Sequence, residues 1–184
     1  MTKGSGEPVK KRTKKSETAA KPQPETNRLF TLDVSIASGP MTGSFKKRNP
    51  VISRTIEIRG DQSLAVLDQA IFDAFGRDDE HMYEFQMGGK EPMDPNATSY
   101  VPSMAMDDPF ADKQPAGDVA RTTIGSLGLV AGEVFAYWFD FGDDWWHRVE
   151  VLAVAAGVPR GKLPKVTRSV GQSPPQYVDW DEER

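Results

Sequence analysis

The chain has 184 residues, no cysteine and a formal net charge of −4 at pH 7. The lack of cysteine excludes disulfides and thiolate metal sites, and no apolar run approaches the ~20 residues that a membrane-spanning helix needs. Because the N-terminal stretch also lacks the apolar core of a signal peptide, we expect a cytoplasmic protein that does not associate with membranes.

The first 28 residues differ in charge from the rest of the chain. Residues 1–28 contain eight Lys or Arg and three Glu, whereas the remaining residues carry an excess of acidic side chains. This segment has almost no large apolar residue, so burial cannot offset the entropy lost on ordering, and we predict a disordered basic tail. Its densest positive cluster, a candidate contact for nucleic acid, comprises Lys10, Lys11, Arg12, Lys14 and Lys15. A tail that only keeps the protein soluble is the alternative.

Four segments that follow the tail have clear periodic patterns. Residues 29–36 and 51–59 alternate apolar and polar side chains, which predicts two strands. Residues 61–76 place apolar side chains at helical spacing, which predicts an amphipathic helix. Residues 82–87 alternate again and predict a third strand. Arg54 shares the apolar face of the second strand, so it requires either an ion-pair partner or a place at the sheet edge from which it reaches solvent.

The connecting segments show less pattern. Residues 37–50 and 90–120 are rich in Gly, Pro and charged side chains, which predicts surface loops, the second long enough to be a flexible insertion. Residues 122–129 predict a short turn of α- or 3₁₀-helix. Residues 157–184 return to Pro, Gly and charge, and no element is predicted there.

Residues 135–154 contain three of the four tryptophans and alternate on both sides of an acidic turn, which predicts a β-hairpin. If a two- or four-residue loop is centred on Asp143 and Asp144, Asp140 faces His147 across the strands. Their side chains would then lie close enough for the carboxylate to favour the protonated imidazole. A three-residue loop would shift the register and remove this pair.

The order of these elements predicts an α+β fold, with a mixed β-sheet and one main helix across a face. In topology the order resembles a β-grasp (ubiquitin-like) sheet extended by the C-terminal aromatic hairpin. We expect one domain over residues 29–180, with an acidic end at 181–184.

Several motifs resemble one known family, the plasmid pRiA4b Orf-three-like proteins. They are residues 52–56, 63–76 and 78–85, the block Phe139-Asp140-Phe141-Gly142-Asp143-Asp144-Trp145-Trp146-His147 with its continuation to Val151, and the proline-rich residues 162–177. The resemblance covers about residues 29–180 apart from the long loop. It implies a plasmid or mobile-element association and no established activity. The chain departs from the family at Arg77, where tryptophan is usual, and at Asp68, where histidine is frequent.

Both histidines lie inside these motifs, and each has aspartates close to it in sequence. Together with the hairpin they predict a polar corner capped by aromatic side chains, and its members are Arg54, His81, Asp140, Asp143, Asp144, Trp145 and His147. In the alternative reading, four of these residues bind a divalent metal that activates water for hydrolysis: His81, Asp140, Asp143 and His147. No fixed ligand spacing supports the metal site, so we assign no metal and no cofactor.

The chain has no nucleophile elbow, Walker loop or dinucleotide-binding glycine motif. We therefore predict a non-enzymatic binding module with an unidentified protein partner. Two alternatives remain: a nucleic-acid-associated protein that acts through residues 1–28, and a metal-dependent hydrolase. The acidic body argues against broad contact with a phosphate backbone outside the tail.

Overall fold

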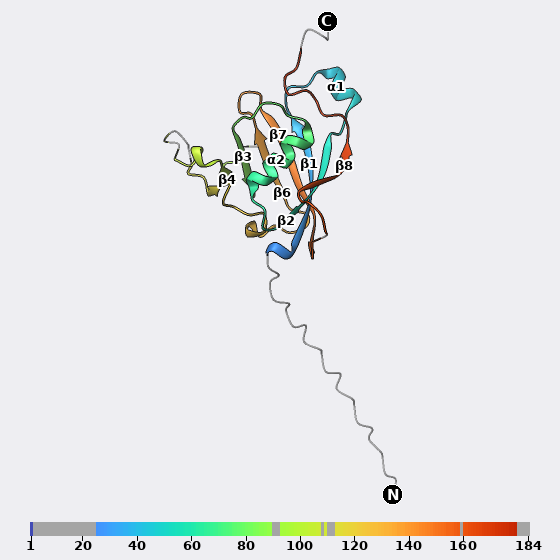
Figure 1. Cartoon of the computed structure of the whole chain (residues 1–184), viewed down its shortest axis with the longest axis vertical. Helices are drawn as coiled ribbons and strands as arrows, with labels where there is room; N and C mark the ends of the chain where they lie inside the picture. The colour runs from blue at the N-terminus through green and yellow to red at the C-terminus, as the bar shows by residue number, and fades with distance from the viewer. Residues whose placement is uncertain (2–24, 90–92, 108, 110–112, 159, 180–184) are drawn as a thin grey trace.

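The computed structural model describes Met1 and residues 25–89, 93–107, 109, 113–158 and 160–179. These residues form an eight-stranded sheet in the order β5-β4-β3-β6-β7-β1-β2-β8. Neighbouring strands are antiparallel except β4 and β5, which pair in parallel. Figure 1 shows the main helix, α2, lying across this sheet. The predicted α+β class, a mixed sheet with one main helix, is confirmed.

The elements follow in this order along the chain: η1 (Glu25–Asn27), β1 (Arg28–Ser38), α1 (Gly43–Arg48), β2 (Ser53–Arg59), α2 (Leu64–Phe75), β3 (Tyr83–Met87), β4 (Thr98–Val101), η2 (Ser103–Ala105), β5 (Gly117–Asp118), η3 (Gly125–Leu127), β6 (Val134–Phe139), β7 (Trp145–Ala156) and β8 (Lys165–Val170). Among the described helices, none has the length and apolar character needed to cross a membrane.

Helix α2 forms where the periodic pattern predicts it. The Ser63 hydroxyl accepts a hydrogen bond from the Val66 amide and caps the N-terminus, and Gly76 ends the helix in a left-handed conformation. The helix buries Leu64, Leu67, Ile71 and Phe75 against the sheet. The strands contribute the alternate side chains that meet them, among them Phe30, Leu32, Ile56, Ile58, Phe135, Val149 and Val151.

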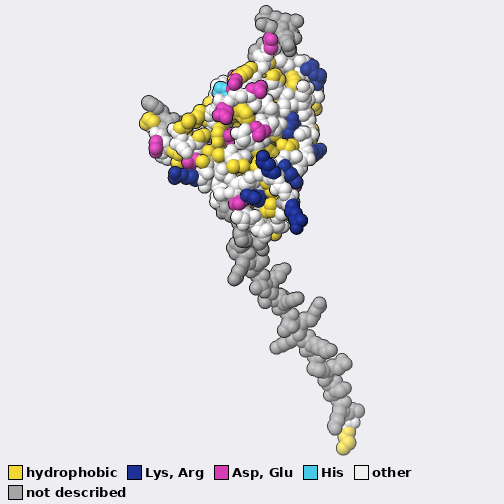
Figure 2. Space-filling model, in the orientation of Figure 1, with side chains coloured by type: hydrophobic (Ala, Val, Ile, Leu, Met, Phe, Trp, Pro, Cys, Tyr) yellow, Lys and Arg dark blue, Asp and Glu magenta, His cyan; other side chains and the backbone are white. Residues whose placement is uncertain are grey.

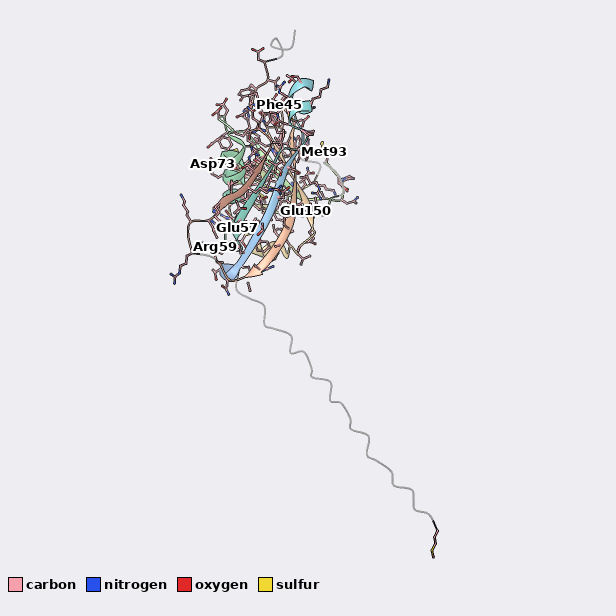
Figure 3. All side chains as sticks on the ribbon, turned by 90° about the vertical axis from the view of Figure 1, so that its right-hand side faces the viewer. Phe45, Glu57, Arg59, Asp73, Met93 and Glu150 are labelled. Atoms are coloured by element: carbon pink, nitrogen blue, oxygen red, sulfur yellow. The ribbon has the colours of Figure 1, made fainter. Side chains whose placement is uncertain are left out.

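Figure 3 views the sheet from the side, with Asp73 of α2 on one face and Met93 on the other. The face opposite α2 carries mostly polar side chains on β1 and β2, such as Asp33 and Thr55. It also carries a stack of three aromatic rings in which Trp138 lies between Trp146 and Phe141, with centroid distances of 4.8 and 4.1 Å.

Several short elements lie in segments that were expected to be irregular. Helix α1 begins at the cap residue Thr42 within the predicted loop 37–50, and β4 and β5 lie within the predicted loop 90–120. Strand β8 lies in the C-terminal segment and pairs with β2 at one edge of the described sheet. The ubiquitin-like strand order is not confirmed, since β1 pairs antiparallel with β7 between the two halves of the sheet.

The two ends of the chain are only partly described. The predicted disordered tail, with its candidate residues Lys10, Lys11, Arg12, Lys14 and Lys15, lies outside the described residues except at its C-terminal end. There, Glu25–Asn27 form a 3₁₀ turn and Arg28 opens β1, so ordered structure begins before residue 29. The predicted acidic end, 181–184, also lies outside the described residues.

The hairpin forms as expected, but its predicted register is wrong. Tyr137 pairs with His147 and Phe139 with Trp145, which leaves a five-residue loop and removes the expected Asp140–His147 pair. The reason is the conformation of Asp140, which has a positive φ of 55° and accepts hydrogen bonds from the amides of residues 142 and 143. An aspartate tolerates this conformation and closes such a turn with its own side chain. Asp140 is therefore a turn residue and does not continue the strand.

Candidate functional site

A groove of about 300 Å³ runs between α2, the start of β3 and the end of β6. We call it the α2 groove, and it is lined by Ala65, Asp68, Gln69, Phe72, Glu80, His81, Tyr83 and Phe139. It combines carboxyl groups with aromatic walls in one concave site. Such a combination is typical of small-ligand sites.

The surroundings of Asp68 in this groove strongly change the pKa of its carboxyl group. Burial raises the pKa of the Asp68 carboxyl to about 7, and the negative charge of Glu80 adds to the shift, although the hydroxyl groups of Tyr137 and Tyr83 oppose it. The Tyr137 hydroxyl donates a hydrogen bond of 2.6 Å to Asp68 Oδ1. Burial beside Asp68 also raises the pKa of Tyr83. Asp68 therefore changes charge near neutral pH at a fixed position in a cleft.

Asp68 is not among the candidate residues predicted from the sequence, although its position on α2 carries a signal. Asp68 follows Leu64 by four residues and precedes Ile71 by three, so it lies on the stripe of α2 that faces the sheet. A carboxyl group on that stripe requires hydrogen-bond partners. The alternating sequence pattern indicates only that Tyr83 and Tyr137 lie on the apolar faces of their strands. Their hydroxyl groups nevertheless supply the hydrogen bonds that Asp68 requires.

His81 lies at the rim of the groove and is exposed. Its Nε2 lies 3.0 Å from the Tyr177 hydroxyl and 3.5 Å from Asp140 Oδ2. The C-terminal segment that carries Tyr177 is held by the neighbouring Gln176, whose side chain accepts hydrogen bonds from the amides of residues 78 and 79. The structure thus brings His81 and Asp140 together, as the predicted polar corner requires.

Acidic side chains surround this rim. On the face that carries α2, Figure 2 shows Asp and Glu grouped near the exposed histidine, whereas most Lys and Arg lie along the right-hand and lower edges, with a further group on the left-hand protrusion. None of the residues that line the α2 groove is Lys or Arg. The groove therefore lies on the acidic side of this face.

The other histidine has a different environment. His147 is 2% exposed and packs against the rings of Phe75 and Tyr137, each with a centroid distance of 5.2 Å. Burial lowers the pKa of His147 to about 3, and the positive charge of Arg77 adds to the shift. Hydrogen bonding to the backbones of Tyr137 and Trp145 opposes this lowering of the pKa in part. His147 is therefore a neutral interior residue at physiological pH.

Arg77 and Trp145 complete an interior group with His147, which we call the buried cluster. The Arg77 guanidinium stacks 3.8 Å above the Trp145 ring and is 6% exposed. Burial lowers the pKa of Arg77 to about 10, while Tyr137 and Asp140 oppose the shift. The guanidinium stays charged at neutral pH, although none of its nitrogens hydrogen-bonds to another described residue.

Arg54 does not line the α2 groove. It has neither of the two environments predicted for it, an ion-pair partner or a place at the sheet edge from which it reaches solvent. Its guanidinium is buried and donates hydrogen bonds to uncharged groups, namely the carbonyl oxygens of Ala74, Ser53, Val170 and Gly171 and the Ser173 hydroxyl. The Ala74 carbonyl lies near the C-terminal end of α2, where the helix dipole favours a cation. Arg54 therefore fastens the C-terminal segment to α2.

The other members of the predicted polar corner, Asp143, Asp144 and Trp145, lie in three different environments. The amide of Asp143 donates to Asp140 within the hairpin turn, whereas Asp144 accepts a hydrogen bond from Trp138 Nε1 and Trp145 is fully buried. Among the residues that the structure describes, no group of three or more His, Asp or Glu side chains could hold a metal ion. The four candidate metal ligands are therefore not assembled as a metal site there.

Comparisons with known proteins agree with this architecture. The fold is of the α+β class, with one main helix on a mixed sheet. The chain belongs to the family described as plasmid pRiA4b ORF-3-like protein, whose model matches residues 43–180. It is also similar in structure to MM3350, a protein of unknown function from Methanosarcina mazei Go1. The TM-score is 0.60 at 20% sequence identity, over 81% of this chain and 73% of that one. That identity establishes a shared fold alone, and no curated protein matches the chain.

Proposed function

We propose that this protein is a non-enzymatic binding module and that the α2 groove is its ligand site. The observation that carries the proposal is the half-buried Asp68 carboxyl, fixed by the Tyr137 hydroxyl at 2.6 Å and set among aromatic walls. A carboxyl group held this firmly in a cleft can bind a polar group of a ligand without first reorganising.

The chemistry of the lining favours binding over covalent catalysis. The residues that line the groove include no Ser, Thr, Cys or Lys, four of the side chain types that form covalent intermediates. One oxygen of Asp68 already accepts from Tyr137. The groove thus offers recognition groups and no nucleophile of these types.

A matched pair of helix variants tests this function. Ala65 lines the groove and Val66 does not, so Ala65→Phe should obstruct the groove whereas Val66→Phe adds a ring on the neighbouring side of the same helix. We expect a thermal-shift screen of small metabolites to find compounds that raise the Tm of the wild type and Val66→Phe but not that of Ala65→Phe. A ligand at about 100 times its Kd stabilises a protein by about 2.7 kcal/mol. A screen without any such compound, or equal shifts in all three proteins, would contradict the proposal.

A further inference from the structure

The walls of the α2 groove identify a class of ligand. Phe72, Tyr83 and Phe139 line it together with His81. The rings of Phe72 and Phe139 are 6.0 Å apart and nearly perpendicular, at 77°, and His81 meets Phe139 at 6.0 Å and 82°. Because these rings meet edge to face, the lining presents aromatic rings in more than one orientation, and aromatic ring faces attract cations.

The charged groups in the groove also favour a positively charged ligand. Asp68 and Glu80 are both carboxylic acids, and no lining residue carries a fixed positive charge. An anion would meet repulsion from both carboxylates, and a neutral ligand could gain hydrogen bonds from them but no attraction between opposite charges. A cation would interact with the carboxylates and with the rings at the same time.

The kind of cation follows from the cost of removing water. A bare ammonium group is strongly hydrated and would lose that hydration against the aromatic walls. A methylated ammonium carries its charge on an apolar surface that suits those walls, and quaternary ammonium ligands are recognised in this way by aromatic cages. A volume of about 300 Å³ suits a small head group.

We propose that the α2 groove binds a methylated ammonium head group, with Asp68 as its counter-ion and Phe72, Tyr83 and Phe139 as its walls. This inference rests on the proposed function and specifies its ligand. Asp68 must be ionised to act, and the groups that face it are Tyr137 from β6, Tyr83 from β3, and Glu80 and His81 from the link between α2 and β3. Binding should therefore strengthen as pH rises through about 7, the pKa of Asp68.

The test uses choline and its uncharged isostere 3,3-dimethylbutan-1-ol as probes in NMR titrations of the full chain. At pH 8, choline should cause saturable shifts at amides around the groove, and the isostere should bind at least about tenfold more weakly. Between pH 8 and pH 6 the ionised fraction of Asp68 falls about tenfold, and the affinity for choline should fall by a similar factor.

Two carboxyl groups of α2 provide the matched control. Asp68→Asn should abolish choline binding, whereas Asp73→Asn, which removes the same charge from an exposed site outside the groove, should bind choline like the wild type. Phe72→Leu removes one wall and should weaken binding about threefold to tenfold, which keeps the proposal testable if Asp68→Asn does not fold.

Equal binding of both probes, no saturable shift with choline, or full binding by Asp68→Asn would overturn the methylated-ammonium site. The proposed binding function would survive that result if the metabolite screen returned a neutral or anionic compound whose effect Ala65→Phe removes. It would fail together with this inference if no compound depended on the groove.

Discussion

The α2 groove and the buried cluster contain similar residue types on either side of Tyr137, but they differ in access to solvent. Tyr137 donates its hydroxyl to Asp68 in the groove and packs its ring against His147 in the buried cluster. His81 is exposed beside one site, whereas His147 is fully enclosed in the other. The difference teaches that a polar side chain inside a family motif is not by itself a functional residue. Only the groove leaves its charged groups within reach of a ligand.

The two regions also respond to pH in opposite directions. Asp68 has its pKa raised to about 7 and His147 has its pKa lowered to about 3. The folded state therefore binds the Asp68 proton more tightly than the unfolded state does, and it resists protonation at His147. Because the two slopes are opposite, the combined contribution of these groups should be nearly constant between about pH 4 and 6.5 and should fall below pH 4 and between pH 6.5 and 7.

The largest effect should come from the centre of the buried cluster. Trp145 is fully buried under the Arg77 guanidinium, so Trp145→Ala should cost about 3–5 kcal/mol of unfolding free energy through the cavity that it leaves. Phe141, in the same hairpin, is 39% exposed, and Phe141→Ala should cost no more than about 1.5 kcal/mol. Urea denaturation of both variants provides the comparison, and equal losses would show that Trp145 does not anchor the interior.

The next effect is the acid sensitivity of His147. Its folded pKa of about 3 lies below the ordinary value of 6.5, so the unfolded state takes up the proton first and stability is lost as pH falls through 6.5 toward 3. Between pH 7 and pH 4.5 this loss should reach about 2–3 kcal/mol. His147→Phe should reduce the fall by that amount when denaturation curves are measured at both pH values. A variant that falls as steeply as the wild type would contradict the assigned pKa.

An effect of similar size and opposite sign is expected for Asp68. Its folded pKa of about 7 lies above the ordinary value, so its contribution is fully present at low pH and is lost as pH rises through 7. The stability of Asp68→Asn relative to the wild type should therefore rise by about 2–3 kcal/mol between pH 5 and pH 8.5. Asp73→Asn, on the exposed side of the same helix, should follow the wild type. No gain in Asp68→Asn would remove the distinction between the groove carboxyl and a surface carboxyl.

The smallest effect concerns the C-terminal segment at the rim. Tyr177→Phe removes the hydroxyl that lies 3.0 Å from His81 Nε2, and it should cost about 0.5–1 kcal/mol because the pair is exposed. Gln176→Ala should cost more, about 1–3 kcal/mol, because this amide is 3% exposed and holds residues 78 and 79. The reverse order would show that the hydroxyl of Tyr177, and not Gln176, holds the segment.

The periodic elements could be predicted from sequence because burial enforces their patterns. Strands β1, β2 and β6 alternate between the helix side and the other face, and α2 presents one apolar stripe. Strand β8 could not be recognised in this way. It lies at the sheet edge with nearly all its side chains exposed, so no apolar alternation marks it.

The candidate site could be predicted only in part. The motifs identified His81 and Asp140, which the structure brings within 3.5 Å. The hairpin register depended on the left-handed conformation of Asp140, which alternation of side chains does not encode. The partners of Arg54 are backbone carbonyls from distant segments, and a sequence pattern that pairs side chains cannot identify them. Asp68 could be predicted as a candidate site residue only if one knew which tyrosines of the neighbouring strands α2 contacts.

The protonation of Asp68 is the central property of the groove, and a ¹³C NMR titration of its side-chain carboxyl measures it directly. We expect the Asp68 carboxyl to titrate near pH 7 in the wild type, and Tyr137→Phe should shift the value further upward because it removes a donor to the ionised form. A titration midpoint near 4 would show that the carboxyl is solvated like a surface aspartate and would contradict the account of the groove as a preformed site.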